Sequence, residues 1–554
     1  MCATKAAQVK NYYYHTKMKK MKYILLAILL GMTSGVVKAQ DYYKMGEQVV
    51  LFNEVCRRLQ NMYVDTLNPE QMISDALNGM TKHMDPYTEF YSAKEKDKLQ
   101  QMLTGKYAGV GAIIKYCLDK KQVVVDYPYE GSPAKKGGFE MGDQILAIDD
   151  TSMVGKPTAY VSSHLRGEPG TSIKVKLKKR STGKVVTTTI VRETIKLPEI
   201  PCSFIYEDDG NKIGVISLSE FTQGCYDHFK EAFLELKRSG MEKLVIDIRG
   251  NSGGSVQEAV DIINMFIARG ELVVQTRGRN SQQDRQYKAT KDPLDQHIPL
   301  MVLVDDESAS ASEILAGSLQ DLDRAKIVGE KTYGKGIVQQ TVPLQNDAEV
   351  KVTVSRYYLP SGRCIQARNY KKGEAEQVAD SLKHTFYTRS GKEVIDGSGI
   401  APDVELKADT MARITYYLHA NDSSELVHNF VCDYLNKYKE IPTFEKFSLS
   451  DADYAEFKKR VIAADFKYDP FTEKMLSQLK EMAKLEGYYD DSQSEFDALE
   501  KKLKHNLDHD LEFHKKDIQA LLEFYIQTGA NSVAEGAKSR YKYDSVFLKA
   551  LKEF

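Results

Sequence analysis

The sequence lacks the features that mark several classes of protein. Its 77 basic and 78 acidic residues are interleaved without long blocks of like charge, and the formal net charge is -1. Because a polyanion is attracted by a concentrated positive field, we expect no nucleic-acid partner. No CxxC or HExxH motif occurs, and no cluster of histidine and cysteine has the spacing of metal ligands. We therefore expect neither a metal nor another cofactor.

Cysteine is scarce as well, and Cys2 lies in a segment that we exclude from the fold. The other six cysteines are widely spaced: Cys56, Cys117, Cys202, Cys225, Cys364 and Cys432. A chain long enough to bury a large core does not need disulfides for its stability, even when it is exported. We therefore predict free, buried thiols.

The apolar run near the N-terminus is much shorter than the ~20 residues of a transmembrane helix. It extends from Ile24 to Leu30, follows the lysine-rich stretch "MKKMK" and precedes small residues that end at Ala39. This order is typical of a secretory signal peptide, so we predict export and cleavage after Ala39. Residues 1–39 are interpreted as an upstream extension, ending before Met18, and the signal peptide.

The pattern of the remaining chain changes three times. Residues 40–105 carry apolar residues at helical spacing, and residues 106–197 hold short alternating strands broken by Gly and Pro. Residues 198–407 alternate buried-looking strands with helical stretches, and residues 408–554 are again helical in pattern. With 554 residues and 42% hydrophobic content, the chain is expected to form about three or four domains. The sequence predicts a multidomain α+β protein.

Two pieces of the β-rich region carry a first resemblance. The piece "YAGVGAII" starts at Tyr107, and "GSPAKKGGFEMGDQILAIDD" starts at Gly131. Together they resemble the carboxylate-binding loop and the strand-helix-strand signature of a PDZ domain, which we place at residues 106–197. Glycines in the loop allow consecutive backbone N–H groups to converge on a carboxylate while a peptide adds as a strand. The peptide-binding residues are expected to be Gly109, Val110, Gly111 and Ala112; a β-bulge in a structural barrel is the alternative reading of these glycines.

Four further pieces carry a second resemblance. They are "DIRGNSGG" from Asp247, "ESASASEILAGSLQD" from Glu307, "VGEKTYGKGIVQ" from Val328 and "YYLPSGRCIQ" from Tyr357. With "MDPYTEFY" before them and "DGSGIAPDVEL" after them, they resemble the carboxyl-terminal processing proteases, also called tail-specific proteases, of peptidase family S41. The resemblance implies a serine-type endopeptidase whose α/β protease core occupies residues 198–407. It also implies polypeptide substrates with free C-termini, and a location in the bacterial periplasm or cell envelope.

By position in the family pattern, the resemblance assigns Ser310 as the nucleophile, Lys335 as the general base and Gln339 as the residue that orients the lysine. Ser-Lys dyads are an established alternative to the Ser-His-Asp triad. Such a lysine must be neutral to accept a proton, and burial lowers its pKa toward that state. The flanking Ser308 and Ser312 are interpreted as cap or first-turn residues.

The surroundings of Ser310 favour the same assignment. An apolar strand ends shortly before it and a helical pattern begins after it, so Ser310 falls near the N-terminus of a helix. Free N–H groups at such a terminus, including that of Ala311, can stabilise an oxyanion. The second donor is expected from the glycine turn at Gly253 or Gly254.

Two other functions stay open at this stage. The segment "GNSGG" satisfies G-x-S-x-G between a strand and a helix, so Ser252 could be the nucleophile of a Ser-His-Asp hydrolase. A catalytically inactive PDZ scaffold is the second alternative, although nucleophile, base and amide are all present. Residues 408–554 could serve dimerisation, substrate docking or structure alone. A homo-oligomer through either helical region and an adaptor are the other partners considered.

Overall fold

The computed structural model describes residues 43–554 except residues 97, 98, 100, 102, 103, 118, 119, 280, 421–424 and 470. The predicted signal peptide, its cleavage site after Ala39 and Cys2 lie outside the described residues. The chain divides into two units, Met1–Met80 and Thr81–Phe554, and each is described by itself.

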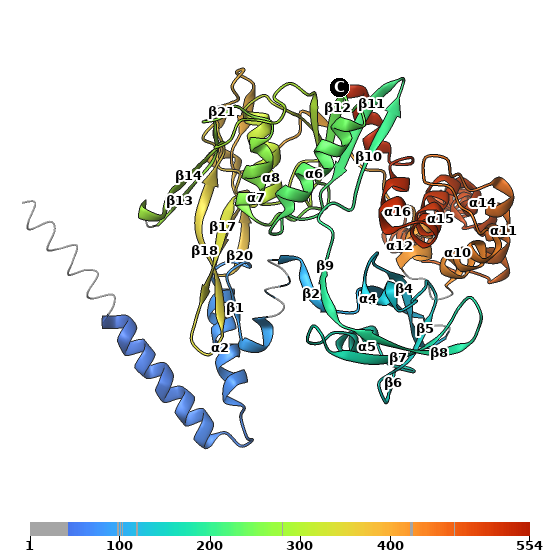
Figure 1. The fold of residues 1–554 in the computed structure, drawn as a ribbon, viewed down its shortest axis with the longest axis horizontal. Helices are drawn as coiled ribbons and strands as arrows, with labels where there is room; N and C mark the ends of the chain where they lie inside the picture. Colours follow the sequence, from blue (N-terminus) through green and yellow to red (C-terminus); the bar gives the residue numbers. More distant parts are fainter. Residues whose placement is uncertain are drawn as a thin grey trace, which may run out of the picture. The chain divides into compact units, whose positions relative to one another are not determined.

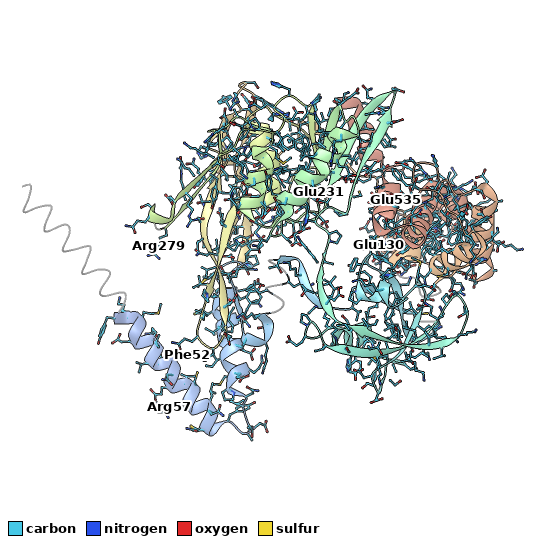
Figure 2. The ribbon with its side chains drawn as sticks, viewed as in Figure 1. Phe52, Arg57, Glu130, Glu231, Arg279 and Glu535 are labelled. Carbon is cyan, nitrogen blue, oxygen red and sulfur yellow. The ribbon has the colours of Figure 1, made fainter. Side chains whose placement is uncertain are left out.

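The first unit is helical where it is described. Residues 43–62 form one helix, and α2 (Pro69–Lys82) starts in this unit. Apolar side chains on the first helix are largely exposed, as Phe52 shows in Figure 2: Val49, Val50, Phe52, Val55 and Leu59. None of the described helices in either unit has both the length and the apolar character needed to cross a bilayer.

The β-rich module at the start of the second unit is built on one antiparallel sheet. Its strands, in sheet order, are β3 (Ala112–Cys117), β4 (Gln122–Pro128), β5 (Gln144–Ile148), β7 (Ser172–Lys178) and β8 (Val185–Val191), and the short β6 (Thr151–Ser152) pairs with β5. In β7 the buried residues alternate with exposed ones, because successive side chains of a strand point to opposite faces. Helix α5 (Thr158–Leu165) packs near β3, and β3 forms an edge of this sheet.

A ribbon of two strands, β2 (Lys106–Gly109) and β9 (Glu193–Lys196), connects this module with the following α/β core. The core holds a six-stranded sheet in the order β10 (Cys202–Asp208), β11 (Asn211–Ser217), β12 (Lys243–Asp247), β15 (Leu300–Val304), β16 (Lys326–Gly329) and β23 (Val404–Glu405). Only β10 and β11 pair antiparallel, and the strands from β11 to β23 run parallel. The central strand β15 is buried along its whole length, as expected for a parallel sheet covered on both faces.

Helices α6 (Cys225–Arg238), α7 (Val256–Asn264) and α8 (Ala311–Asp321) share one hydrophobic core with one face of this sheet (Figure 1). The other face packs against the C-terminal part of the chain. Here Val245, Met301 and Leu303 of the sheet form a core cluster with Tyr541 and Phe547. The last helices therefore complete the core of the α/β region.

A second sheet joins distant parts of the sequence. It contains β1 (Glu89–Tyr91), β18 (Glu349–Tyr358), β13 (Leu272–Gly278) and β14 (Arg285–Lys288), and β17 (Ile337–Pro343) pairs with β18. Figure 1 shows β1 beside β18. Strand β1 departs from the expectation that residues 40–105 are helical throughout. Asp85 explains the change, because its side chain accepts the N–H groups of Tyr87 and Thr88 and turns the chain just before the strand.

The C-terminal region is helical, as predicted from its pattern. Its helices are α9 (Arg413–Ala420), α10 (Leu426–Lys437), α11 (Asp451–Ala463), α12 (Phe471–Glu486), α13 (Gln493–Leu503), α14 (Leu507–Phe513), α15 (Lys515–Ala530), α16 (Val533–Arg540) and α17 (Ser545–Ala550). Their core cluster includes Met141 of the β-rich module. The exact domain boundaries given above stay predictions.

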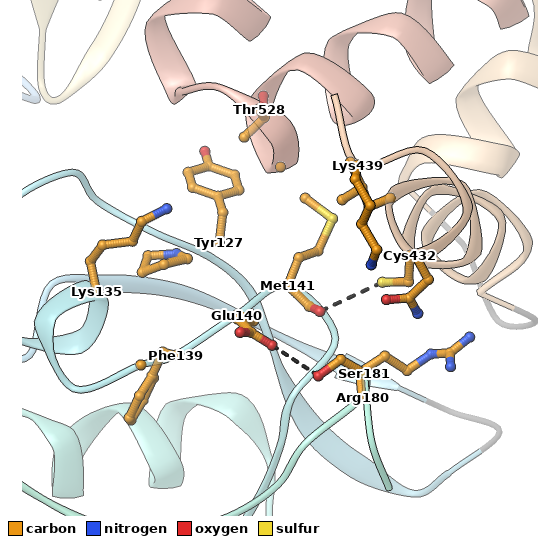
Figure 3. A pocket seen from close by; sticks show the side chains of 15 residues that line it. Tyr127, Lys135, Phe139, Glu140, Met141, Arg180, Ser181, Cys432, Lys439 and Thr528 are labelled. Atoms are coloured by element: carbon orange, nitrogen blue, oxygen red, sulfur yellow. Dashed lines mark hydrogen bonds between the residues drawn. The ribbon is translucent and has the colours of Figure 1, made fainter. Parts of the chain in front are cut away.

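The β-rich module and the C-terminal helices meet at a cavity of about 450 Å³ (Figure 3). Polar contacts surround it: Cys432 Sγ lies 3.6 Å from the Met141 carbonyl oxygen, and Arg180 pairs with Asp433 at 2.7 Å. All six cysteines named above are free, but the prediction that they are also buried holds for only some of them. Four of the thiols are buried, whereas Cys56 and Cys364 are only half-buried.

Candidate active site

Ser310 occupies a strained position between a strand and a helix. Strand β15 ends at Val304, and Ser310 is the N-cap of α8 with φ 57°. A residue with a Cβ rarely adopts a positive φ, and such strain is concentrated at functional sites. Ser310 is half-buried, so its hydroxyl lies at the boundary between the core and the surface.

The two flanking serines are buried and make structural hydrogen bonds. Ser308 Oγ donates to the Ile248 carbonyl oxygen at 2.9 Å, and Ser312 Oγ donates to the Asn251 carbonyl oxygen at 2.8 Å. Both bonds hold the start of α8 against the loop that follows β12. This agrees with their interpretation as structural residues.

A buried carboxylate connects the predicted nucleophile with the predicted base. Glu313 accepts the backbone N–H of Ser310 at 2.9 Å and that of Lys335 at 2.8 Å. It also accepts Gly334 N–H at 2.7 Å and the Thr332 hydroxyl at 2.6 Å. Burial raises the pKa of Glu313, and these four donors oppose that change because they stabilise the charged form.

Sequence reasoning missed Glu313, although the sequence carried a signal for it. Residue 313 lies three positions after the N-cap Ser310, where a Glu closes a capping box. Tyr357 was also missed as an individual residue. Its buried hydroxyl lies 2.7 Å from the Lys335 carbonyl oxygen and 3.1 Å from that of Ser310. Glu313 and Tyr357 together fix the backbone at both predicted catalytic positions.

Lys335 has the environment that a lysine base needs. Burial, with a smaller effect of the nearby Lys351 ammonium, lowers the pKa of Lys335 to about 8. Its Nζ lies 4.1 Å from the centroid of the Tyr87 ring. Among the described residues, no hydrogen bond joins this Nζ to Ser310. In this structure the ammonium therefore rests on an aromatic face, an arrangement that stabilises a cation.

Gln339 is not joined to the lysine in this arrangement. Its Nε2 donates to Thr353 Oγ1 at 3.3 Å, because β17 pairs Gln339 directly with Thr353 of β18. Lys335 precedes the strand, whereas Gln339 lies inside it. The spacing of four residues therefore runs from an irregular segment into a strand, and the orienting role of Gln339 stays a prediction.

The loop after β12 supplies the surroundings for an oxyanion. Gly253 has φ 109°, and a Cβ built there would lie 2.7 Å from Ser310 Cβ and 3.0 Å from the Ala311 nitrogen. Only glycine fits at this position. The Gly253 N–H donates to Asn251 Oδ1 at 2.9 Å. The N–H groups of Ala311 and Gly254 donate to no described residue, which leaves these two predicted donors available.

A cavity of about 670 Å³ lies beside this site; Lys335 and Ala309 line it, whereas Ser310 is not among its lining residues. It is lined by Tyr87, Gly250, Ser252, Asp306, Glu307, Ala309, Thr332, Tyr333, Lys335 and Arg368. Ser252 is exposed on its wall, but its backbone does not adopt the positive φ found at Ser310. No described histidine lines this cavity, so the structure does not bring Ser252 together with a triad base.

The predicted carboxylate-binding loop lies in the β-rich module, between β2 and β3. Val110 and Gly111 are buried residues, and their N–H groups donate no hydrogen bond to a described residue. Gly111 has φ 75°, and a Cβ there would lie 2.5 Å from Ser132 Cβ. Among the described strands, β3, which contains Ala112, pairs with β4 alone and offers its other edge to an added strand.

Comparisons with known proteins show which families the chain is similar to. The model of peptidase family S41 matches residues 212–373, a PDZ domain model matches residues 124–179, and the model "Probable PDZ-protease, C-terminal helical domain" matches residues 414–554. The carboxy-terminal processing protease CtpB of Bacillus subtilis is 30% identical over 338 residues, which are 60% of this chain and 67% of that protein. A carboxy-terminal-processing protease of Bartonella bacilliformis is 31% identical over 348 residues, which are 62% of this chain and 78% of that protein.

Among solved structures, a photosystem II D1 C-terminal processing protease is 28% identical, with a TM-score of 0.35, over 64% of this chain and 92% of that chain.

Proposed function

Because the chain belongs to peptidase family S41 and is a carboxy-terminal processing serine protease with a PDZ domain, we propose that it cleaves polypeptides with a Ser310–Lys335 dyad and selects them by their free C-termini. The observation that carries the proposal is the Glu313 carboxylate, which accepts the backbone N–H of both Ser310 and Lys335. Two residues that are distant in sequence are thereby held at one site.

The proposed chemistry uses side chains of this chain alone. Neutral Lys335 takes the hydroxyl proton of Ser310 while Oγ attacks the scissile carbonyl carbon. The developing oxyanion accepts the N–H of Ala311 and one from the glycine turn. Lysine then returns the proton to the leaving amine, and water hydrolyses the acyl-enzyme. For this sequence Lys335 must lose its proton and move from the Tyr87 ring toward Ser310 Oγ.

The PDZ loop supports selection by the chain end. The unpaired N–H groups of Val110 and Gly111 would otherwise cost about 1–3 kcal/mol each when buried. A terminal carboxylate provides acceptors for both, and the free edge of β3 accepts the preceding residues as a strand. We propose that substrates enter in this way and are cut upstream at Ser310.

The test of the catalytic assignment compares three variants on one tailed polypeptide. Ser310→Ala and Lys335→Ala are expected to give no cleavage products by mass spectrometry, while Ser252→Ala retains substantial activity. Loss of activity in Ser252→Ala with retention in Ser310→Ala would select the G-x-S-x-G reading. Binding of tails by the wild type without any product would select the inactive scaffold.

We also propose that the protein is exported and that its helical regions or an adaptor provide contacts with partners. The order of lysines, apolar run and small residues before Ala39 supports secretion into the periplasm or cell envelope. N-terminal sequencing of the protein from an envelope fraction should begin at Gln40; a sequence that retains the leader would contradict cleavage. Size-exclusion chromatography tests a homo-oligomer through the helical regions, and co-purification tests an adaptor.

A further inference from the structure

Two arginines face each other directly across two antiparallel strands of the second sheet. Arg277 of β13 is paired in register with Arg356 of β18. Directly opposite residues project from the same face, and like charges in that arrangement are destabilising. Arg279 lies just beyond the last residue of β13, where Figure 2 labels it, and lines the same cavity as Arg277 and Arg356.

No carboxylate of the described residues lies within 4.0 Å of these three guanidinium groups. The nearby acids are engaged with backbone instead. Asp284 Oδ1 accepts the Gly278 N–H at 2.9 Å, and Asp85 accepts the Tyr87 N–H at 2.8 Å. Arg277 is held by the ring of Tyr358, whose centroid lies 4.6 Å from its guanidinium carbon. None of the three arginines is therefore paired directly with a described carboxylate, although Asp85 also lines their cavity.

The arginines line a cavity of about 420 Å³ that adjoins the catalytic one. Its lining consists of Met84, Asp85, Arg277, Gly278, Arg279, Ile337, Thr353, Val354, Ser355, Arg356, Gln366, Arg368, Asn369 and Tyr370. Arg368 also lines the catalytic cavity and donates to the Tyr333 carbonyl oxygen at 3.0 Å. A ligand in the arginine cavity therefore lies beside the proposed cleavage site.

We propose that this arginine cavity binds acidic side chains of the substrate polypeptide near the bond that is cleaved. The inference rests on the proposed function, since it makes Ser310 the neighbouring cleavage site. Carboxylates suit the cavity because arginine presents paired N–H donors that match their geometry. They also relieve the repulsion between Arg277 and Arg356. A hollow of side-chain size beside the catalytic cavity fits an extended peptide better than a flat protein surface.

The test uses pairs of peptides that share the same C-terminal tail. One member of each pair carries two Asp residues and the other two Asn residues, and the position of these residues relative to the cleavage site is varied stepwise. At low salt the wild type should cleave the best acidic peptide about tenfold better in kcat/KM than its Asn partner. The preference should shrink at high salt. Arg277→Gln/Arg356→Gln should lose it while cleaving the Asn peptide within about twofold of the wild type. Arg285→Gln is the control, because Arg285 pairs with Thr276 and therefore lies on the opposite face.

Equal cleavage of both peptides by the wild type, or an unchanged preference in the double variant, would overturn the proposal. If neither peptide is cleaved, the proposed protease function is contradicted independently of the cavity. Fluorescence anisotropy with the acidic peptide then tests whether the arginine cavity binds acidic side chains. Weaker binding by the double variant supports the proposal, and equal binding overturns it. Binding of heparin without binding of either peptide would also overturn it, because the ligand would then be a polysaccharide.

A second, independent observation concerns the C-terminal helices. Arg249 forms a fork with Asp247, with Nε 2.9 Å from Oδ1 and Nη2 2.6 Å from Oδ2. The same guanidinium donates to Asp544 through Nη2 at 2.6 Å and Nη1 at 3.2 Å. Tyr541 donates its hydroxyl to Asp247 at 2.8 Å. These four side chains link the helical domain to the start of the loop that contains Gly253.

We infer that Tyr541 and Asp544 are positioning residues for the oxyanion loop. A misplacement of the loop relative to Ser310 would weaken stabilisation of the transition state more than binding of the substrate. This gives residues 408–554 a role in catalysis besides covering the sheet. The role acts through Arg249, which begins the turn leading to Gly253.

Asp544→Asn and Tyr541→Phe are each expected to lower kcat about tenfold with KM changed less than twofold. Asp544→Glu should restore most of the rate, because it returns the charge. Glu456→Gln, which removes only a half-exposed ion pair with Arg460, is the control on the same domain. An unchanged kcat, or a loss that follows the fraction of unfolded protein in thermal melts, would overturn the inference.

Discussion

The candidate catalytic centre and the PDZ loop differ in whether their backbone N–H groups are hydrogen-bonded within the chain. At the candidate catalytic centre, Glu313 accepts four hydrogen bonds and holds the backbone of Ser310 and Lys335 in place. In the PDZ loop, the buried N–H groups of Val110 and Gly111 find no acceptor in the part of the chain that is described. The backbone of the first site is therefore held in place without a substrate, although Lys335 Nζ still has to leave the Tyr87 ring, whereas the proposed function has a ligand complete the second site.

This difference indicates what each site requires. Preorganised groups stabilise a transition state without rearrangement at the moment of reaction, so their removal lowers the rate. Unpaired donors favour a ligand that carries its own acceptors, so their obstruction lowers recognition. Variants that separate rate from recognition therefore test the comparison.

The largest effect is expected at Lys335. Lys335→Met keeps an apolar chain of similar length but removes the base, so kcat should fall at least about a hundredfold. Binding of a tailed peptide, measured by fluorescence anisotropy, should stay within about twofold. Loss of tail binding in this variant would show that the two sites are not separable.

The second-largest effect on the rate is expected for Glu313→Gln. The amide presents only one acceptor oxygen to four donors, so some N–H groups remain buried and unpaired. We expect kcat to fall at least about tenfold and the free energy of unfolding to fall by about 2 kcal/mol. Kinetics and denaturant unfolding measure the two quantities. Glu231→Gln, at an exposed position of α6 labelled in Figure 2, is the control and should change neither; full activity of Glu313→Gln would refute the preorganised centre.

A substitution in the PDZ loop should act on recognition. Gly111→Val adds a side chain at φ 75° and drives its Cβ against Ser132, so kcat/KM for tailed substrates should fall about tenfold. Gly131→Ala is a matched control, because its φ is 68° but a Cβ there meets no atom within 4 Å. Equal losses in both variants would mean that backbone strain, and not the loop, causes the effect.

The smallest effects concern pH. Since the pKa of Lys335 is lowered to about 8 and its neutral form is the base, kcat/KM should rise with pH through a value near 8. Lys351→Gln removes a positive charge that disfavours protonated Lys335, so this midpoint should move upward by a few tenths of a pH unit. A flat profile between pH 6 and pH 9, with chemistry rate-limiting, would contradict the lysine base.

Sequence motifs predicted the family and the order of its regions, and they assigned Ser310, Lys335 and the PDZ loop by position, assignments that stay predictions. The three-residue strand β1 was not predicted because it is too short for its alternation to be recognised. The four-residue spacing between Lys335 and Gln339 did not reveal that Lys335 lies in an irregular segment and Gln339 in a strand. Glu313 had a capping signal, but its bonds to Gly334 and Lys335 depend on a tertiary contact between distant segments.

The C-terminal helices show a further limit of sequence reasoning. Their amphipathic pattern predicted helices, and it could not indicate which surface their apolar faces would cover. Tyr541 and Phe547 pack on the core sheet, and Asp544 contacts Arg249, which lies 295 positions earlier in the sequence. Such pairings follow from the packing of whole layers and leave no local signal.

The most direct test of the central claim is to measure kcat/KM for one substrate prepared as the free acid and as the C-terminal amide. The account predicts that the acid is preferred about tenfold or more, because only a carboxylate offers acceptors to both unpaired N–H groups without adding donors of its own. It also predicts that Gly111→Val removes this preference. Equal kcat/KM for acid and amide in the wild-type enzyme would contradict recognition of the chain end.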